Sequence, residues 1–267
     1  MSSSECSRSM ASATTPIAWG VLLFLYLPIA ALVWMSFNAG PSALVWQGWG
    51  VHGYVDAVRD ETLMRAAVTS LTLAFVSMLA STAIALAAAV TGWTFAPRKR
   101  SVLAVWISLP LVIPEIVLAI GTLLLVAMLS IEPGFTVVAF AHIVFCLPFA
   151  YLPISARLER IDRSLLDAAA DLSATPWAVL RQITLPLALP GILAGAMLAF
   201  VASMNDYVTS YFLAGAGFTT LPMYIFSALK LGITPKINAV STAIVGVSAL
   251  QLAGVWLARA DKNFKTT

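Results

Sequence analysis

Long stretches without any charged residue constrain this chain more than any other feature of its sequence. No Asp, Glu, Lys or Arg occurs in residues 9–55, 66–97, 133–156 or 237–258. Each stretch can hold the roughly 20 apolar residues that a helix needs to cross a bilayer. The residues do not alternate between apolar and polar, as they would in a membrane β-strand. With 60% hydrophobic and 10% charged residues, the sequence predicts an all-α integral membrane protein.

Six transmembrane helices account for the apolar part of the chain, which we expect to form one domain over residues 16–267. Residues 1–15 are Ser-rich and lack both the Lys/Arg-rich start and the cleavage site of a secretory signal. We therefore expect them to form a short cytoplasmic tail. The six helices are expected at about residues 17–37, 63–92, 102–129, 135–155, 187–207 and 238–258.

The distribution of Lys and Arg over the loops predicts the orientation of the chain. With six helices, successive loops alternate between the two sides of the membrane. The cytoplasmic side of a membrane protein carries the excess of Lys and Arg, so both termini are expected in the cytoplasm. The richer side holds Arg8, Arg98, Lys99, Arg100, Arg157, Arg160, Arg163, Arg181, Arg259, Lys262 and Lys265, and the other holds Arg59, Arg65, Lys230 and Lys236.

The cytoplasmic loop at about residues 156–186 carries most of the charge of the chain. Asp162 or Ser164 can cap the start of a helix there, and Asp167 lies near its positive end, where a carboxylate is favoured. A second short helix is expected over residues 176–183, ended by the Leu-Pro pair before the fifth span. The first helix contains small, strongly helix-forming residues that would let a partner approach closely: Ala168, Ala169 and Ala170.

This loop resembles the EAA loop of ABC-importer permeases. That family's pattern is Glu-Ala-Ala, three residues, Gly, nine residues, then Ile-x-Leu-Pro, and every spacing fits here. Asp167 replaces the Glu, and Ser173 replaces a Gly suited to a left-handed turn, at a cost of about 1 kcal/mol. The resemblance implies a type I ABC importer permease fold, in which this loop docks on a separate ATPase. The implied coupling residues are Asp167, Ala168, Ala169, Ala170, Ser173, Ile183, Leu185 and Pro186.

Four later segments are similar to the second permease subunit of spermidine/putrescine importers: residues 185–195, 204–208, 219–223 and 230–239. The resemblance implies a bacterial inner-membrane protein that carries a small cationic solute. It also implies a second permease subunit, two ATPase subunits and a periplasmic binding protein as partners. The chain has no Gly-x-x-x-x-Gly-Lys-Ser/Thr phosphate-binding stretch, so ATP and Mg belong to the ATPase.

Other functions remain open from the residues alone. The same machine could carry another small amine, an amino-acid-like solute or a phosphonate. An ion-coupled secondary carrier is a different class, but such folds usually have more helices and internal repeats. An intramembrane enzyme would need a nucleophile and a base, and the sequence offers no such set. We therefore expect a transporter subunit that is not an enzyme and has no cofactor of its own.

The candidate substrate-pathway residues are Glu115, Asn205, Asp206 and Tyr207. Glu115 lies in the third expected span, where a charge costs roughly 2.5–3.5 kcal/mol unless a cavity or a partner accommodates it. Asp206 lies near the outer end of the fifth span. We expect two separate positions for a polycation, Asp206 at the entrance and Glu115 deeper. The alternatives are an ion pair between Glu115 and the partner subunit, and an Asp206 that simply contacts water.

Several other residues are expected to have structural roles. His142 has no Cys, Asp or Glu at ligand spacing, so a hydrogen bond between packed helices is preferred over a metal site. Gly191 and Gly195 would allow close helix packing. Cys6 and Cys146 are not expected to form a disulfide. Aromatic residues in the first outer loop mark the membrane interface or contact a binding protein: Trp46, Trp49 and Tyr54, with His52 beside them.

Overall fold

The structure is a computed structural model that describes residues 3–43, 45–94, 100–162, 164–232, 234–247 and 249, with side chains from Ala18 onward. It divides into two compact units. The first unit contains Met1–Glu61 and Ser227–Thr267, and the second contains Thr62–Phe226.

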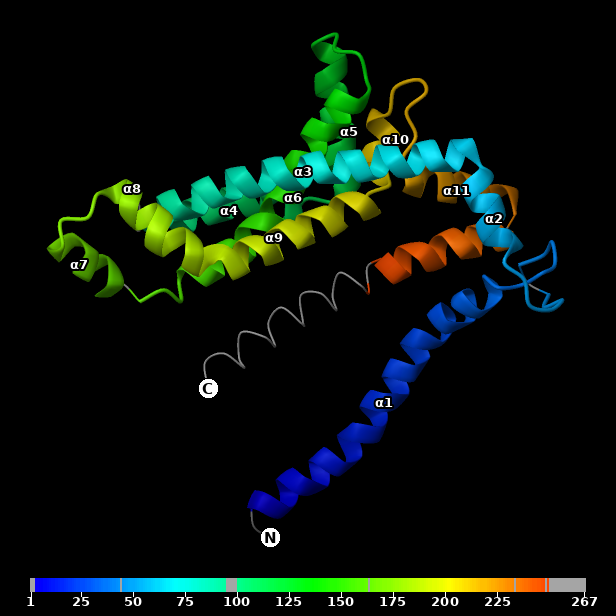
Figure 1. Cartoon of the computed structure of the whole chain (residues 1–267), viewed down its shortest axis with the longest axis horizontal. Helices are drawn as coiled ribbons and strands as arrows, with labels where there is room; N and C mark the ends of the chain where they lie inside the picture. Colours follow the sequence, from blue (N-terminus) through cyan, green and yellow to red (C-terminus); the bar gives the residue numbers. More distant parts are fainter. Residues whose placement is uncertain are drawn as a thin grey trace. The chain divides into compact units, whose positions relative to one another are not determined.

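The described chain is helical apart from its connections and one isolated bridge between Asn38 and Trp49 (Figure 1). The prediction of an all-α fold is therefore confirmed for these residues. Residues 235–247 are also helical. The other helices are α1 (Ser3–Met35), α2 (His52–Arg59), α3 (Glu61–Thr94), α4 (Arg100–Val112), α5 (Glu115–Met128), α6 (Phe135–Leu158), α7 (Ser164–Asp171), α8 (Pro176–Val179), a π-helix (Leu180–Thr184), α9 (Leu185–Asn205), α10 (Val208–Leu213) and α11 (Leu221–Leu231).

Four helical segments of the described chain are long and apolar enough to cross a membrane: Ala18–Met35, Glu61–Thr94, Phe135–Leu158 and Pro176–Asn205. The pair α4 and α5 adds a fifth if the two are counted as one span. Part of the sixth expected span, residues 250–258, lies outside the described residues. The described chain thus holds four or five of the six expected spans.

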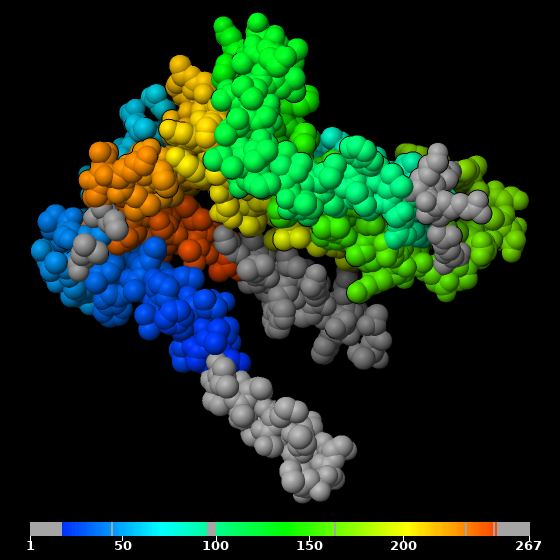
Figure 2. All heavy atoms as spheres, turned by 180° about the vertical axis from the view of Figure 1, so that it is seen from behind, coloured from blue at the N-terminus to red at the C-terminus, as the bar shows by residue number. Residues whose placement is uncertain are grey.

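The third expected span, residues 102–129, is not one straight helix. It consists of α4 and α5, which meet at an angle of 97° (Figure 2, where α5 rises in green and α4 runs to the right in blue-green). The break falls at Ile113 and Pro114. Proline has no N–H to donate and disfavours the helical conformation of the residue before it. Glu115 is consequently the first residue of α5 and not a residue within a continuous span.

The fifth expected span also differs from the prediction. The short helix after Thr175 does not end before Pro186 but continues through the π-helix into α9, giving one helical segment from Pro176 to Asn205. The N–H of Leu185 donates to the carbonyl of Leu180, the five-residue spacing of a π-helix. Pro186 falls in the first turn of α9, inside this continuous segment, so it donates no N–H to the carbonyl one turn earlier.

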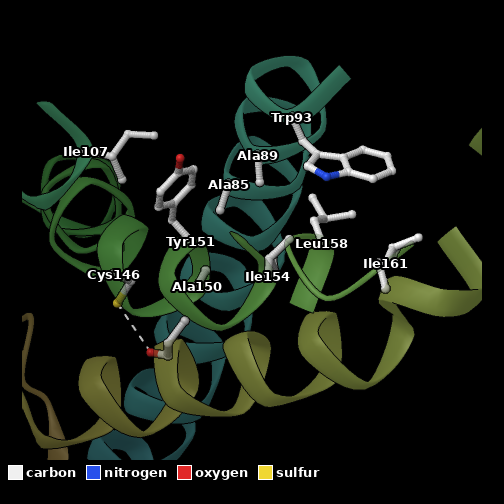
Figure 3. Packing of buried hydrophobic residues seen from close by; sticks show 12 residues of the cluster. Ala85, Ala89, Trp93, Ile107, Cys146, Ala150, Tyr151, Ile154, Leu158 and Ile161 are labelled. Carbon is white, nitrogen blue, oxygen red and sulfur yellow. Dashed lines mark hydrogen bonds between the residues drawn. The ribbon is translucent and has the colours of Figure 1, made fainter. Parts of the chain in front are cut away.

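The second unit has its main hydrophobic core where α6 packs against α9. A Cβ atom at Gly195 would lie 2.5 Å from the carbonyl oxygen of Ala150, and one at Gly191 would lie 2.6 Å from Cβ of Arg157. The predicted role of both glycines in close helix packing is confirmed. Cys146 is buried in this core as a free thiol and donates to the carbonyl of Ala199 at 3.3 Å (Figure 3).

The first unit contains α1, a loop that leads to α2, and the helix at residues 235–247. α1 begins at Ser3, so the segment expected as a tail is helical. Buried Asn38 organises the loop, because its amide nitrogen donates to the carbonyls of Ser42 and Val45, both at 2.7 Å. The loop carries the predicted aromatic residues Trp46 and Trp49, whose ring centroids are 5.1 Å apart, whereas Tyr54 lies in α2.

Candidate functional site: an acidic pair at two helix breaks

Two interruptions of helical structure meet within the second unit. The first is the bend before α5, and the second separates α9 from α10, with Asp206 and Tyr207 between them. α10 packs against both α5 and α6. This packing places the carboxyl groups of Glu115 and Asp206 within interaction distance of each other. The two predicted pathway acids therefore form one pair, and the expectation of two separate positions is wrong.

Asp206 is buried within the chain, with 4% of its surface exposed. Its Oδ1 accepts the N–H of Thr209 at 2.9 Å. Its Oδ2 is also buried, and no residue in the described part of the chain donates a hydrogen bond to it. An unsatisfied buried carboxylate oxygen carries a large desolvation cost. The alternative in which Asp206 is a water-exposed outer acid is thus wrong, and a cation that reached Oδ2 would satisfy it.

His142 of α6 is fully buried beside Asp206. Its Nδ1 lies 2.8 Å from the hydroxyl oxygen of Ser203 on α9, and its Nε2 lies 3.1 Å from that of Ser210 on α10. The predicted role of His142, a hydrogen bond between packed helices, is confirmed. Nε2 also lies 3.2 Å from Oδ2 of Asp206, without hydrogen-bond alignment. Among the described residues, no group of three His, Cys, Asp or Glu could hold a metal ion.

Tyr207, which follows Asp206 in the chain, belongs to a group of aromatic rings. Tyr207, half-buried, stacks on Tyr211 with ring centroids 5.4 Å apart, and contacts Phe226 at 4.5 Å. Aromatic faces attract cations, more strongly where water is excluded. Asn205, the last residue of α9, is exposed. Carboxylates beside aromatic rings can hold an alkylammonium group, with the charge on the acids and the methylenes against the rings.

The loop at residues 156–186, which is expected in the cytoplasm and is called the coupling loop below, contains the left-handed turn expected from the sequence. Ser173 has a φ angle of 55°. The N–H of Ala174 donates to the carbonyl of Ala169 at 3.0 Å, and the N–H of Ser173 donates to that of Ala170 at 2.9 Å. These two bonds form a Schellman motif, which ends α7. Ser173 thus occupies the position that usually favours glycine.

The start of α7 is fixed by Asp162, whose Oδ1 accepts the N–H of Ser164 at 3.0 Å. Hydrogen bonds from the backbone N–H of Ser164 and then from its side chain lower the pKa of Asp162. Capping by Asp162, one of the two predicted possibilities, is what the structure contains.

Fewer of the small residues of α7 are exposed than the sequence suggests. Ala168 and Ala170 are exposed, but Ala169 is 6% exposed and so faces the protein. Large apolar residues that the sequence analysis missed are exposed on the coupling loop, above all Leu172 at 83% and Trp177. Their position after the Ala run was visible in the sequence, but their exposure depends on the turn at Ser173.

The remaining predicted coupling residues lie at different places along the loop. Asp167 is exposed in the first turn of α7. Ile183 is half-buried in the π-helix, and Leu185 and Pro186 begin α9. They are therefore continuous with the helix that ends at the acidic pair.

Comparison with known proteins defines the class of this chain. It belongs to the family described as binding-protein-dependent transport system inner membrane component, which it matches over residues 81–260. It is thus a multi-pass inner-membrane permease subunit of a binding-protein-dependent ABC importer, and it is not itself an enzyme. The resemblance found in the sequence is confirmed.

Two relatives are similar along most of their length. The chain is 38% identical to the putrescine transport system permease protein PotI of Escherichia coli strain K12, over 90% of this chain and 89% of that protein. It is 36% identical to the spermidine/putrescine transport system permease protein PotC of the same organism, over 91% of this chain and 92% of that protein.

A solved structure supports the fold. A bacterial ABC transporter involved in the import of the acidic polysaccharide alginate has a chain with a TM-score of 0.66 to this one. The match covers 98% of both chains at 17% identity, which establishes a common fold only.

Proposed function

We propose that this permease subunit moves a small cationic solute, a polyamine such as putrescine or spermidine, into the cell. The observation that carries this proposal is the pair formed by half-buried Glu115 and buried Asp206, with an unsatisfied oxygen on Asp206. The names of the two Escherichia coli relatives point to the same solutes.

The electrostatics of the pair favour a cationic cargo. Two carboxylates repel each other, and the repulsion grows where water is scarce. A protonated amine between them would replace this repulsion with two attractions and would donate to the free Oδ2 of Asp206. Tyr207 would accommodate the adjoining methylenes. The attraction must remain weak enough for release, as in any conduction pathway.

The contact with Asp206 bears on the alternative role of Glu115, an ion pair with the partner subunit. Glu115 already faces a second acid from its own chain. An entering cation would therefore meet two carboxylates at once. A cation from the partner subunit would also meet both carboxylates. Measuring complex yield and uptake together for Glu115→Gln separates the two roles, because only the loss of an ion pair between subunits would lower the yield of the complex.

We propose that the chain works with a second permease subunit, two ATPase subunits that bind ATP and Mg, and a periplasmic binding protein. Both termini would face the cytoplasm. The exposed residues of α7 and the turn after it support docking of the coupling loop on the ATPase. Reporter fusions that are active only in the cytoplasm should be active at both ends of the chain, and an inactive fusion at either end would contradict this orientation.

The cargo can be tested with the cognate binding protein and the assembled importer. We expect putrescine or spermidine to bind the purified binding protein and to be imported at the cost of ATP. Excess polyamine should compete with labelled cargo, whereas neutral amino acids and 2-aminoethylphosphonate should not. Import of either of the latter in place of polyamines would overturn the proposed cargo but leave the importer class intact.

A further inference from the structure

The buried imidazole of His142 joins three helices at the acidic pair. It comes from α6, and its ring nitrogens face Ser203 of α9 and Ser210 of α10. Its Nε2 is also 3.2 Å from Oδ2 of Asp206, and both side chains are fully buried. The ring therefore fills the junction at which α9 stops and α10 begins.

The two ring nitrogens have different surroundings. A neutral imidazole has one donor nitrogen and one acceptor nitrogen. Nε2 faces a carboxylate oxygen and a hydroxyl oxygen, whereas Nδ1 faces only the hydroxyl of Ser203. The carboxylate favours the form in which Nε2 carries the proton, because an unprotonated nitrogen would repel it. Nδ1 then accepts the proton of the Ser203 hydroxyl.

The orientation of Asp206 follows from these contacts. Its Oδ1 is held by the N–H of Thr209, so its Oδ2 must lie on the side of the imidazole. His142 holds Ser210 on the same turn of α10. The ring thus fixes both the start of α10 and the direction of Oδ2, without itself satisfying that oxygen.

We propose that His142 is a positioning residue for cargo recognition: it fixes the place of the Asp206 carboxylate beside Glu115, in the acidic pair that would attract a protonated amine. This inference rests on the proposed function, because it assigns a role within the same site. A histidine that only packed helices would affect assembly but not the affinity of the assembled importer for its cargo.

A matched pair of amide variants separates these two roles. The side-chain amide of Gln reaches the place of Nε2, and that of Asn reaches the place of Nδ1. His142→Gln therefore keeps a polar group at the place of Nε2, bonded to Ser210 and next to Asp206, while His142→Asn keeps only the contact with Ser203. We expect His142→Asn to raise the KM for ATP-driven putrescine uptake about tenfold, since hydrogen bonds next to a charge contribute about this much. His142→Gln should remain near the wild-type KM.

Serine variants provide a second test that leaves the ring in place. Ser210→Ala removes the partner of Nε2, and Ser203→Ala removes the partner of Nδ1. Even if His142→Asn fails to assemble, Ser210→Ala should raise the KM more than Ser203→Ala. In an Asp206→Asn background, where the charge to be positioned is gone, His142→Asn should add little to the KM.

The outcomes distinguish this inference from the proposed function. A rise in KM for His142→Asn and Ser210→Ala, with normal complex yield, supports the positioning role. The positioning role would be overturned if His142→Asn and His142→Gln had equal KM values and Ser210→Ala and Ser203→Ala did too. It would also be overturned if the variants lowered the yield of the complex without changing the KM. A wild-type importer that takes up no polyamine would contradict the proposed cargo instead, whatever the His142 variants do.

Discussion

Ser173 illustrates how a single residue can adopt the geometry that its family pattern assigns to glycine. Its φ of 55° lies in the left-handed region, where a Cβ atom is unfavourable. We expect Ser173→Gly to stabilise the end of α7 by about 0.5 kcal/mol, because relief of this strain exceeds the added freedom of the unfolded chain.

Hydrogen exchange measures this effect at the amide of Ala174, which donates across the turn. Its exchange should slow in Ser173→Gly. Ser164→Gly is the control, because Ser164 begins α7 and lies outside the turn; there the substitution should not slow exchange. Faster exchange at Ala174 in Ser173→Gly would show that the serine side chain contributes more than its strain costs.

Asp162 makes the cap of α7 dependent on pH. The hydrogen bonds from Ser164 lower the pKa of Asp162 in the folded loop. The stabilisation is therefore complete above the unfolded pKa of about 4 and is lost as the pH falls through the lower, folded value. An NMR titration of the Ser164 amide should give a midpoint below about 4, and a midpoint at or above that value would argue against the cap.

At the scale of elements, the positions of the long spans followed from the sequence. The spans expected at residues 63–92 and 135–155 are α3 and α6, with ends at most three residues away. Charge-free apolar runs are enough for this, since hydropathy depends on local composition. The turn at Ser173 was predictable in the same way, because the spacing of residues in the loop motif specified its position.

The helix breaks were harder to predict, because proline acts differently in different surroundings. Pro110 and Pro190 lie inside helices, whereas Pro114 precedes a 97° bend. The π-helix before Pro186 was not predicted for the same reason. The burial of Asp206 depends on the packing of α10 against α5 and α6, which no local pattern specifies. The acidic pair therefore became visible only in three dimensions.

The coupling loop offers a prediction at this scale. Leu172 is 83% exposed directly before the left-handed turn, on a loop otherwise rich in charge. If the loop docks on the ATPase, Leu172→Asp should place a charge in an apolar contact and lower ATP-driven uptake at least about tenfold. Insertion into the membrane should not change, because Leu172 has little burial to lose.

Leu231, 92% exposed at the end of α11, provides the matched control. Leu231→Asp makes the same chemical change outside the coupling loop, so uptake and ATPase co-purification should stay near wild type. If Leu172→Asp retains normal uptake and normal co-purification of the ATPase, Leu172 does not contribute to docking.

At the scale of the whole molecule, the acidic pair and the coupling loop are connected by the same two helices. α6 carries His142 and leads to the loop, and α9 leads from the loop to Asp206. The 21 residues of α9 span about 30 Å at the usual rise per residue. Because Gly191 and Gly195 bring α9 against α6, we expect the two helices to move together when the loop moves.

The central claim is that Glu115 and Asp206 together recognise a cationic cargo. ATP-driven putrescine uptake into proteoliposomes, measured with complex yield for Glu115→Gln, Asp206→Asn and the double variant, tests it most directly. We predict that each single variant raises the KM about tenfold or more at unchanged yield. The double variant should cost less than the product of the singles, because the two acids bind the same ammonium group. Normal uptake by all three variants at limiting putrescine would contradict the account.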